Sequence, residues 1–193
     1  MVRNPLLKLY NEVTPKSFEA NDYLRHVESR VKITREYSWA VPTQRALKVI
    51  AAHAPIVEMG AGTGYWASLL KKMGCDVIAY DRWTKEKSPF GLNMWNTGNK
   101  FTEVLCGGPR ILSKHSDRTL FLCWPPLGNV MAYDCLRYWR GKTLVYVGEF
   151  NGCCATPSFF KALNKSFLLE TQEKIPQWLG IHDVLTVWTR NDQ

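Results

Sequence analysis

The chain has 193 residues, enough for one domain with a sizeable core, and 46% of them are hydrophobic, which excludes a disordered chain. No apolar run approaches the roughly 20 residues that cross a bilayer, and the N-terminal residues lack the apolar core of a signal peptide. The 25 basic and 17 acidic residues give a net charge of +8, which permits RNA or another anionic partner, although the basic residues form no dense run.

The N-terminal part of the chain contains two predicted helices. Residues 1–17 are expected to be irregular because prolines interrupt them. In residues 18–31, apolar side chains recur at helical spacing; they are Tyr23, Leu24, Val27 and Val31. The other face of this helix is basic, and it is either solvated or a contact for an anionic partner. An aromatic loop follows at residues 37–42, and Thr43 is expected to cap a helix over residues 44–53.

The next segment joins an apolar run to a glycine-rich turn. Residues 55–57 predict a buried strand, which is followed by Glu58 and by three glycines at alternate positions, Gly60, Gly62 and Gly64. Because glycine lacks a Cβ atom and tolerates positive φ, the backbone can turn sharply there and approach a ligand closely. A carboxylate pointed into this turn would repel a pyrophosphate, but it would suit an ammonium group.

A helix and a second strand complete this unit. Residues 65–73 predict the helix, which ends at Gly74. Residues 75–80 predict the strand, and Asp81 lies at its carboxyl end. An acid at this place can accept hydrogen bonds from both hydroxyls of a ribose. A strand, a glycine turn, a helix and a strand that ends in an acid together predict a site for an adenosine-containing cofactor.

This pattern resembles the glycine motif of the class I S-adenosylmethionine-dependent methyltransferases. In that family the E/D-x-G-x-G-x-G turn holds the methionine part of the cofactor, and the acid after the second strand holds the ribose. The resemblance therefore implies S-adenosyl-L-methionine as the cofactor, with Glu58 at its ammonium group and Asp81 at its ribose. The alternative is a nucleotide-free α/β domain, but a glycine turn alone does not require acids at both places.

Strands and helices alternate along the rest of the chain. Residues 82–100 show little periodicity and are expected to contribute to the substrate pocket. Strands are expected at 101–105, 119–123, 143–147, 167–173 and 184–188, and helices at about 131–139 and 157–163. This alternation implies an α/β fold with a mostly parallel sheet and helices on both faces. The resemblance adds a seven-stranded sheet in the order 3-2-1-4-5-7-6, with strand seven antiparallel.

The resemblance also divides the chain into two parts. Residues 46–193 would form the domain that binds S-adenosylmethionine, and residues 1–45 would form an N-terminal helical lid or substrate element. Tyr37 would close over the cofactor together with Trp39, as N-terminal aromatic residues often do in this fold. The alternative is that both side chains only pack the N-terminal segment onto the sheet.

The unusual residues of the chain follow the carboxyl ends of predicted strands, where ligands bind in open α/β sheets. Trp124-Pro125-Pro126-Leu127 resembles the [N/D/S]-P-P-[Y/F/W] signature of methyltransferases that act on amino groups. The first residue of that signature accepts a hydrogen bond, which an indole cannot do. Trp124 is therefore expected to form an apolar wall at the methyl-transfer point or to contact the sulfonium by a cation–π interaction, with Pro125 beside the cofactor. The alternative is a diproline that only ends the strand.

Two titratable residues at the same edge are candidate bases for the methyl acceptor. Glu149 follows an apolar strand, and desolvation there would suit a base or a residue that orients an amine. His182 precedes the last strand and is the best-placed titratable group for proton removal at neutral pH. The alternatives are a solvated acid at a strand end and a loop histidine that is hydrogen-bonded by Asp183.

The six cysteines show no C-x-x-C motif and no spacing with histidine that fits zinc, so no metal site is expected. Their pattern indicates reduced thiols in a cytoplasmic compartment.

Methyl transfer to a nucleophilic N, O or S atom of a nucleic acid or a small molecule is the function that these features favour. One alternative is a non-catalytic protein of the same fold that binds RNA or a ribonucleoprotein, but such a scaffold has no need of the glycine turn and its acids. A second alternative is a nucleotide-binding oxidoreductase, which Glu58 and the position of the third glycine disfavour.

Overall fold

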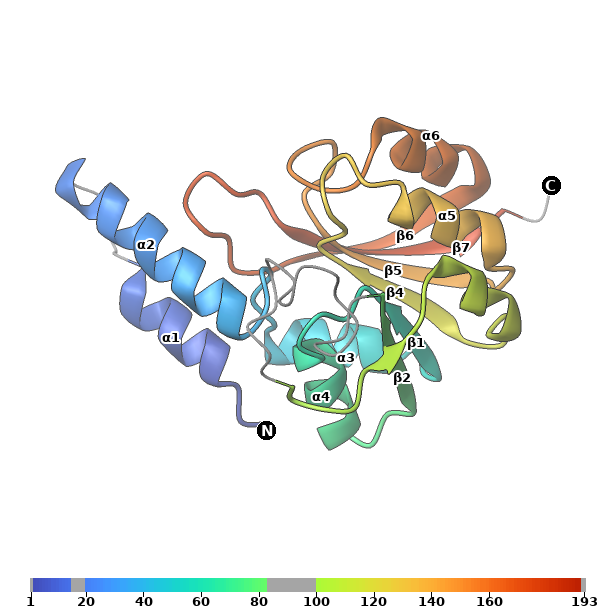
Figure 1. The fold of residues 1–193 in the computed structure, drawn as a ribbon, viewed down its shortest axis with the longest axis horizontal. Helices are drawn as coiled ribbons and strands as arrows, with labels where there is room; N and C mark the ends of the chain where they lie inside the picture. Colours follow the sequence, from blue (N-terminus) through green and yellow to red (C-terminus); the bar gives the residue numbers. More distant parts are fainter. Residues whose placement is uncertain (1, 15–19, 83–99, 192–193) are drawn as a thin grey trace.

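The computed structural model describes residues 2–14, 20–82 and 100–191. A central sheet carries helices on both faces, and two N-terminal helices extend to one side of it (Figure 1). Within the described ranges, no helix is both long and apolar enough to cross a bilayer.

The sheet has seven strands in the order β3-β2-β1-β4-β5-β7-β6, which confirms the predicted order. The strands are β1 (Ile56–Met59), β2 (Val77–Asp81), β3 (Leu105–Cys106), β4 (Thr119–Cys123), β5 (Thr143–Gly148), β6 (Phe167–Lys174) and β7 (Val184–Arg190). The pairs from β3 to β5 are parallel, whereas β7 runs antiparallel to both β5 and β6. The carboxyl ends of the parallel strands and the amino end of β7 therefore meet at one edge.

Two apolar clusters fill the space between the sheet and its helices. One face is covered by α3 (Gln44–Ala51) and α4 (Tyr65–Lys72), and the other by α5 (Met131–Tyr138), α6 (Pro157–Ser166) and the short helix η1 (Pro109–Lys114) (Figure 1). Alternate residues of one strand serve the two faces. In β4, Phe121 belongs to the first cluster, whereas Leu120 and Leu122 belong to the second.

The N-terminal segment is more regular than predicted. The expectation that residues 1–17 are irregular is wrong for Pro5–Val13, which form helix α1. Pro5 is compatible with a helix because it lies in the first turn, where its missing N–H has no intrahelical partner. The side chain of Asn4 caps this helix by accepting a hydrogen bond from the Leu7 N–H at 3.0 Å. Helix α2 (Ala20–Glu36) continues beyond its predicted end at residue 31.

The third strand is shorter than predicted. A strand was expected at residues 101–105, but only Leu105–Cys106 pair with β2. Phe101 instead packs against Tyr37 and Tyr65, with ring centroids 5.2 and 4.8 Å away, and its N–H donates to the Thr63 carbonyl at 3.0 Å. This segment is thus held at the glycine turn rather than in the sheet. Apart from its two ends, the stretch 82–100 lies outside the described residues.

The N-terminal helices are attached to the domain at several points. Leu6 is fully buried in the cluster of α3 and α4. The Tyr10 hydroxyl donates to the Gln177 carbonyl at 2.9 Å, and the buried indole of Trp178 donates to the Trp39 carbonyl at 2.8 Å. Gln177 and Trp178 belong to the loop between β6 and β7, so this loop and the N-terminal segment lie side by side at the edge where the parallel strands end.

Candidate functional site

The glycine turn joins β1 to α4 through a left-handed backbone. Gly60, Gly62 and Gly64 have φ values of 78°, 54° and 72°, which side chains other than glycine rarely adopt. A Cβ atom on Gly64 would lie 2.8 Å from Cγ2 of Val104. A Cβ atom on Gly62, by contrast, would meet no described atom within 4 Å, apart from its chain neighbours. The left-handed φ, rather than a clash with described atoms, therefore favours glycine at position 62.

Glu58 lies in β1 immediately before the turn, and it is 1% exposed. Its Oε2 atom is buried and has no hydrogen-bond partner among the described residues. Burial raises the pKa of Glu58 to about 8, and the negative charge of Asp81 adds to this effect, whereas the nearby N–H of Ala67 opposes it. A buried carboxyl oxygen without a partner is unfavourable. A cationic group bound at the turn would compensate for it, so the site fits the ammonium group of an amino acid.

Asp81 ends β2 next to the same turn. Its Oδ2 atom accepts a hydrogen bond from the Gly62 N–H at 2.9 Å, and the residue is 7% exposed. The carboxyl group is therefore oriented by the backbone of the turn. This arrangement is compatible with a role in holding a ribose beside the turn.

Tyr37 lies between the N-terminal segment and the turn. Its ring stacks on Phe101 with centroids 5.2 Å apart and meets the edge of Tyr65 at the same distance. The hydroxyl of Thr63, inside the glycine turn, donates to the Tyr37 carbonyl. Burial, reinforced by the charge of Glu36, raises the pKa of Tyr37. Tyr37 thus packs the N-terminal segment against the turn, which places it where it could also contact a cofactor.

Trp124 follows β4 and has an unusual backbone conformation. Its φ of 52° lies in the left-handed region, which is uncommon for a residue with a large side chain. Its ring stacks on Trp39, with centroids 4.6 Å apart and an interplanar angle of 15°. The indole Nε1–H donates to Oδ1 of Asp183 at 2.7 Å. The next residue, Pro125, is buried, and its carbonyl accepts from the Ala155 N–H at 2.9 Å.

Asp183 lies beside Trp124 in the candidate site, although the sequence did not single it out as a site residue. It was considered only as a hydrogen-bond partner of His182, but it bonds to Trp124 instead. The residue is fully buried, and its Oδ2 atom has no hydrogen-bond partner among the described residues. Burial raises the pKa of Asp183 to about 7, which the hydrogen bond from Trp124 counteracts in part. The only sequence signal for Asp183 was its position between a histidine and an apolar strand.

The two buried acids face a common neighbour. Cys123, at the end of β4, has a pKa raised well above its usual value by burial, and then by the negative charges of Glu58 and Asp183. Glu58 and Asp183 are thus on the same face of the sheet, the face covered by α3 and α4. Both acids therefore lie close enough to Cys123 to act on its pKa.

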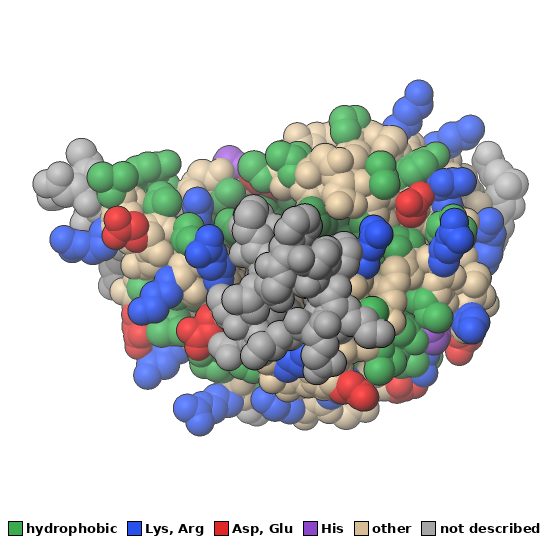
Figure 2. Space-filling model, in the orientation of Figure 1, with side chains coloured by type: hydrophobic (Ala, Val, Ile, Leu, Met, Phe, Trp, Pro, Cys, Tyr) green, Lys and Arg blue, Asp and Glu red, His purple; other side chains and the backbone are tan. Residues whose placement is uncertain are grey.

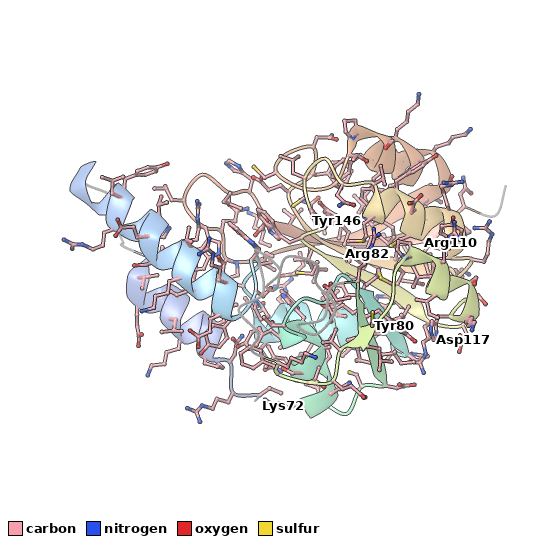
Figure 3. The ribbon with its side chains drawn as sticks, viewed as in Figure 1. Lys72, Tyr80, Arg82, Arg110, Asp117 and Tyr146 are labelled. Atoms are coloured by element: carbon pink, nitrogen blue, oxygen red, sulfur yellow. The ribbon has the colours of Figure 1, made fainter. Side chains whose placement is uncertain are left out.

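Glu149 and His182 are brought together on the other side of Asp183. Oε1 of Glu149 accepts from the His182 N–H at 2.8 Å and lies 3.3 Å from Nδ1 of the same residue. Oε2 accepts from the Cys153 N–H at 2.7 Å. Burial alone would raise the pKa of Glu149, but these hydrogen bonds outweigh it and lower the pKa. The carbonyl of Glu149 accepts from the hydroxyl of Tyr146, which is labelled in Figure 3, at 2.7 Å.

Other features bear on possible ligands. The side chain of His182 is 79% exposed, so its imidazole is accessible from solvent. In residues 2–14, 20–82 and 100–191, no group of three or more His, Cys, Asp or Glu side chains is arranged to hold a metal ion. On the face shown in Figure 2, Lys and Arg side chains are scattered among apolar and acidic ones rather than gathered in one patch.

Comparisons with known proteins support the fold. No family model matches the chain, and no curated protein matches its sequence. Among solved structures, magnesium protoporphyrin IX methyltransferase (ChlM) from Synechocystis PCC 6803 with bound SAH is 10% identical, with a TM-score of 0.51 over 96% of this chain and 94% of that one. The PH0226 protein from Pyrococcus horikoshii OT3 is 15% identical, with a TM-score of 0.50 over 94% of this chain and 98% of that one. With the strand order β3-β2-β1-β4-β5-β7-β6, these likenesses show that the chain has the fold of the class I S-adenosylmethionine-dependent methyltransferases.

Proposed function

We propose that this protein is a methyltransferase that uses S-adenosyl-L-methionine and methylates a nucleophilic N, O or S atom of a nucleic acid or a small molecule. The observation that carries this proposal is the buried Oε2 of Glu58, which has no hydrogen-bond partner among the described residues, at a left-handed glycine turn. An acidic group at this place cannot compensate the negative charge of a dinucleotide's pyrophosphate, and its ionised form would repel that group. It favours a ligand that brings a positive charge to the turn, such as the methionine part of S-adenosylmethionine.

The proposed cofactor site uses residues of β1, β2 and the turn between them. Glu58 would hold the ammonium group, and Gly60, Gly62 and Gly64 would let the cofactor approach the backbone. Asp81 would accept hydrogen bonds from the ribose, since its carboxyl group is already oriented by the Gly62 N–H. Tyr37 would cover the site from the N-terminal segment. When bound, the cofactor supplies a methyl group activated by the sulfonium.

Trp124 and Pro125 would line the point of methyl transfer. The indole N–H of Trp124 is already used by Asp183, so this side chain contributes its aromatic face. An aromatic face can attract a sulfonium by a cation–π interaction and keeps water away from the reacting atoms. With an activated methyl group, positioning and water exclusion provide most of the catalysis.

His182 would take a proton from the acceptor where one must be removed. Its Nδ1 faces Glu149, so a neutral imidazole that donates from Nδ1 keeps Nε2 as the proton acceptor. Both oxygens of Glu149 are engaged in hydrogen bonds. We therefore assign Glu149 the orientation of His182 and of the adjacent loop, and His182 the transfer of the proton.

The substrate side of the site would be formed by residues 1–45 as a helical lid or substrate element. The hydrogen bonds of Tyr10 and Trp178 support this assignment because they join that segment to the loop that leads to His182. The net charge of +8 is compatible with RNA or another anionic acceptor. The six cysteines, all free thiols, support a reducing, cytoplasmic compartment.

Calorimetric titration tests the proposal. The purified protein is titrated with S-adenosylmethionine and S-adenosylhomocysteine, with NAD and ATP as matched controls. We expect micromolar binding of the first two ligands alone. Binding of NAD in their place would indicate an oxidoreductase, and binding of none of the four would favour a scaffold that keeps the fold without the chemistry.

A further inference from the structure

A pair of stacked tryptophans covers a buried acid at the proposed methyl-transfer point. Trp124 stacks on Trp39 with ring centroids 4.6 Å apart, and its indole donates to Oδ1 of Asp183 at 2.7 Å. The second oxygen of Asp183 is buried without a partner in the described chain. The indole of Trp124 is thus fixed by a carboxyl group at its N–H end and by a second ring on one face.

This arrangement is unfavourable for folding alone. A fully buried carboxyl group with one oxygen that has no partner in the described part of the chain destabilises the native state, and the left-handed φ of 52° at Trp124 adds backbone strain. Asn or Gln at position 183 would avoid the buried negative charge. Buried charges and strained residues of this kind concentrate at functional sites. Asp183 is therefore a candidate for a role that needs its charge and not only its hydrogen bond.

We infer that Asp183 is a positioning residue that acts through the indole of Trp124 to make the site prefer a positively charged sulfonium over a neutral thioether. The inference rests on the proposed function. A hydrogen bond to an anionic acceptor is stronger than one to a neutral acceptor, and it draws electron density into the indole ring. The ring face then attracts a cation more strongly.

The reaction itself makes such a preference useful. In methyl transfer the S–CH3 bond breaks as the bond from carbon to the acceptor forms, and the positive charge leaves the sulfur. The electron pair of the broken bond stays on sulfur, which becomes a neutral thioether, and any proton lost by the acceptor passes to a base. An indole face of Trp124 that attracts positive charge therefore binds S-adenosylmethionine more tightly than S-adenosylhomocysteine, and this promotes the exchange of the product for new cofactor.

The test compares the affinities of S-adenosylmethionine and S-adenosylhomocysteine, which differ in the charged methyl group. Asp183→Asn keeps an acceptor for the indole but removes the charge. We expect it to weaken S-adenosylmethionine binding roughly three- to tenfold, as expected for losing a cation–π contribution, while S-adenosylhomocysteine binding changes less than about twofold. Calorimetry at about pH 8, where most of the Asp183 carboxyl is ionised because its pKa is about 7, gives both constants without any methyl acceptor.

Two further variants make the test specific. Trp124→Phe keeps an aromatic ring but removes the N–H, so it should reduce the same preference, and Asp183→Asn should add little in that background. The matched control is Thr186→Val, because Thr186 accepts at 2.9 Å from the indole of Trp188 on the opposite face of β7 through a neutral hydroxyl. This control should leave the ratio of the two affinities unchanged.

The outcomes separate this inference from the proposed function. If the wild-type protein binds neither ligand, the proposed function fails and the inference fails with it. If it binds both and the folded Asp183→Asn variant keeps the wild-type ratio, the inference is overturned while the function stands. If Asp183→Asn does not fold, an unchanged ratio in folded Trp124→Phe overturns it equally. A parallel loss of both affinities assigns Asp183 to general support of the site and also overturns it.

Discussion

Asp81 and Gly62 are joined by a hydrogen bond of 2.9 Å, from the backbone N–H of the turn to the side chain at the end of β2. The contact connects the two parts of the proposed cofactor site before any ligand arrives. A carboxyl group that is oriented in advance loses less conformational freedom when it binds a ribose. The same bond also holds the glycine turn against the neighbouring strand.

Replacing Asp81 by alanine should weaken cofactor binding by roughly 1–3 kcal/mol, the usual loss for a charged hydrogen-bond partner. Calorimetric titration of Asp81→Ala with S-adenosylhomocysteine measures this effect. The control is Asp76→Ala, since Asp76 is an acid just before β2 whose side chain is 62% exposed and pairs with Arg118. Unchanged affinity in a folded Asp81→Ala protein would remove Asp81 from the ribose site.

Cofactor binding should release a proton near pH 7. Burial raises the pKa of Glu58 to about 8, so its carboxyl group is mostly protonated at pH 7 in the free protein. An ammonium group at Oε2 stabilises the ionised form and lowers this pKa. We expect the binding heat to depend on the ionisation enthalpy of the buffer, corresponding to release of up to about one proton.

Glu58→Gln should abolish the part of this proton release that comes from Glu58 and should weaken binding. The number of protons released by Glu58→Gln is compared with the number released by Asp183→Asn, because the pKa of Asp183 is also raised, to about 7. Equal binding heats in phosphate and Tris buffers at pH 7 would contradict the ionisation of Glu58 on binding.

The sheet and the glycine turn could be predicted because their signals are local. The alternate glycines permit a left-handed backbone, and the strand order follows from the resemblance that those glycines and two acids carry. Helix α1 was not predicted because Pro5 usually interrupts a helix, and only the cap at Asn4 identifies it as the first turn. The strand at 101–105 was predicted too long because the apolar side chain of Phe101 suggested a place in the sheet. In the structure this side chain instead packs against Tyr37 and Tyr65.

The contacts of Asp183 could not be predicted because they join distant parts of the chain. Asp183 and Trp124 are 59 residues apart, and no spacing rule relates them. The sequence placed both residues at the same edge of the sheet, which was sufficient to predict proximity but not pairing. His182 and Asp183 are adjacent, so a bond between them was the natural alternative. The structure instead pairs His182 with Glu149.

The free energy of unfolding should fall as the pH rises from about 4 to 8, owing to Glu58 and Asp183. Their pKa values in the folded protein are raised from 4.5 to about 8 and from 3.8 to about 7. Between these limits the folded protein binds more protons than the unfolded chain, so stability decreases with pH, by at most about 1.4 kcal/mol per pH unit for each group. Their contribution is fully present below about pH 4.

Urea denaturation at several pH values measures this dependence. Relative to the wild type, Glu58→Gln and Asp183→Asn should each become more stable as the pH rises from 5 to 8, because each removes one such group. Parallel stability curves for the wild type and both variants would show that these acids do not have raised pKa values in the folded protein.

His182→Ala should reduce turnover while leaving cofactor affinity unchanged, because the exposed imidazole is proposed to act on the acceptor and not on the cofactor. Losing a general base typically lowers the rate by a factor of about 100 or more.

Glu149→Gln should have a smaller effect on turnover, but it should shift the pH dependence of kcat/KM. An amide offers only one acceptor oxygen and no charge to stabilise the protonated imidazole. The rising limb of the rate–pH profile should therefore lie at lower pH in Glu149→Gln than in the wild type.

The control for these variants is His53→Ala, since His53 precedes β1 at the opposite edge of the sheet and its carbonyl, which the substitution retains, accepts from Thr119. It should keep both the rate and the pH profile.

A wild-type rate in His182→Ala would reject His182 as the base and would assign its contact with Glu149 to the support of the loop alone. If Glu149→Gln lost turnover as severely as His182→Ala without a shift in the pH profile, Glu149 would act on the acceptor directly. Each variant must also bind S-adenosylhomocysteine with the wild-type affinity, because this shows that its cofactor site is intact.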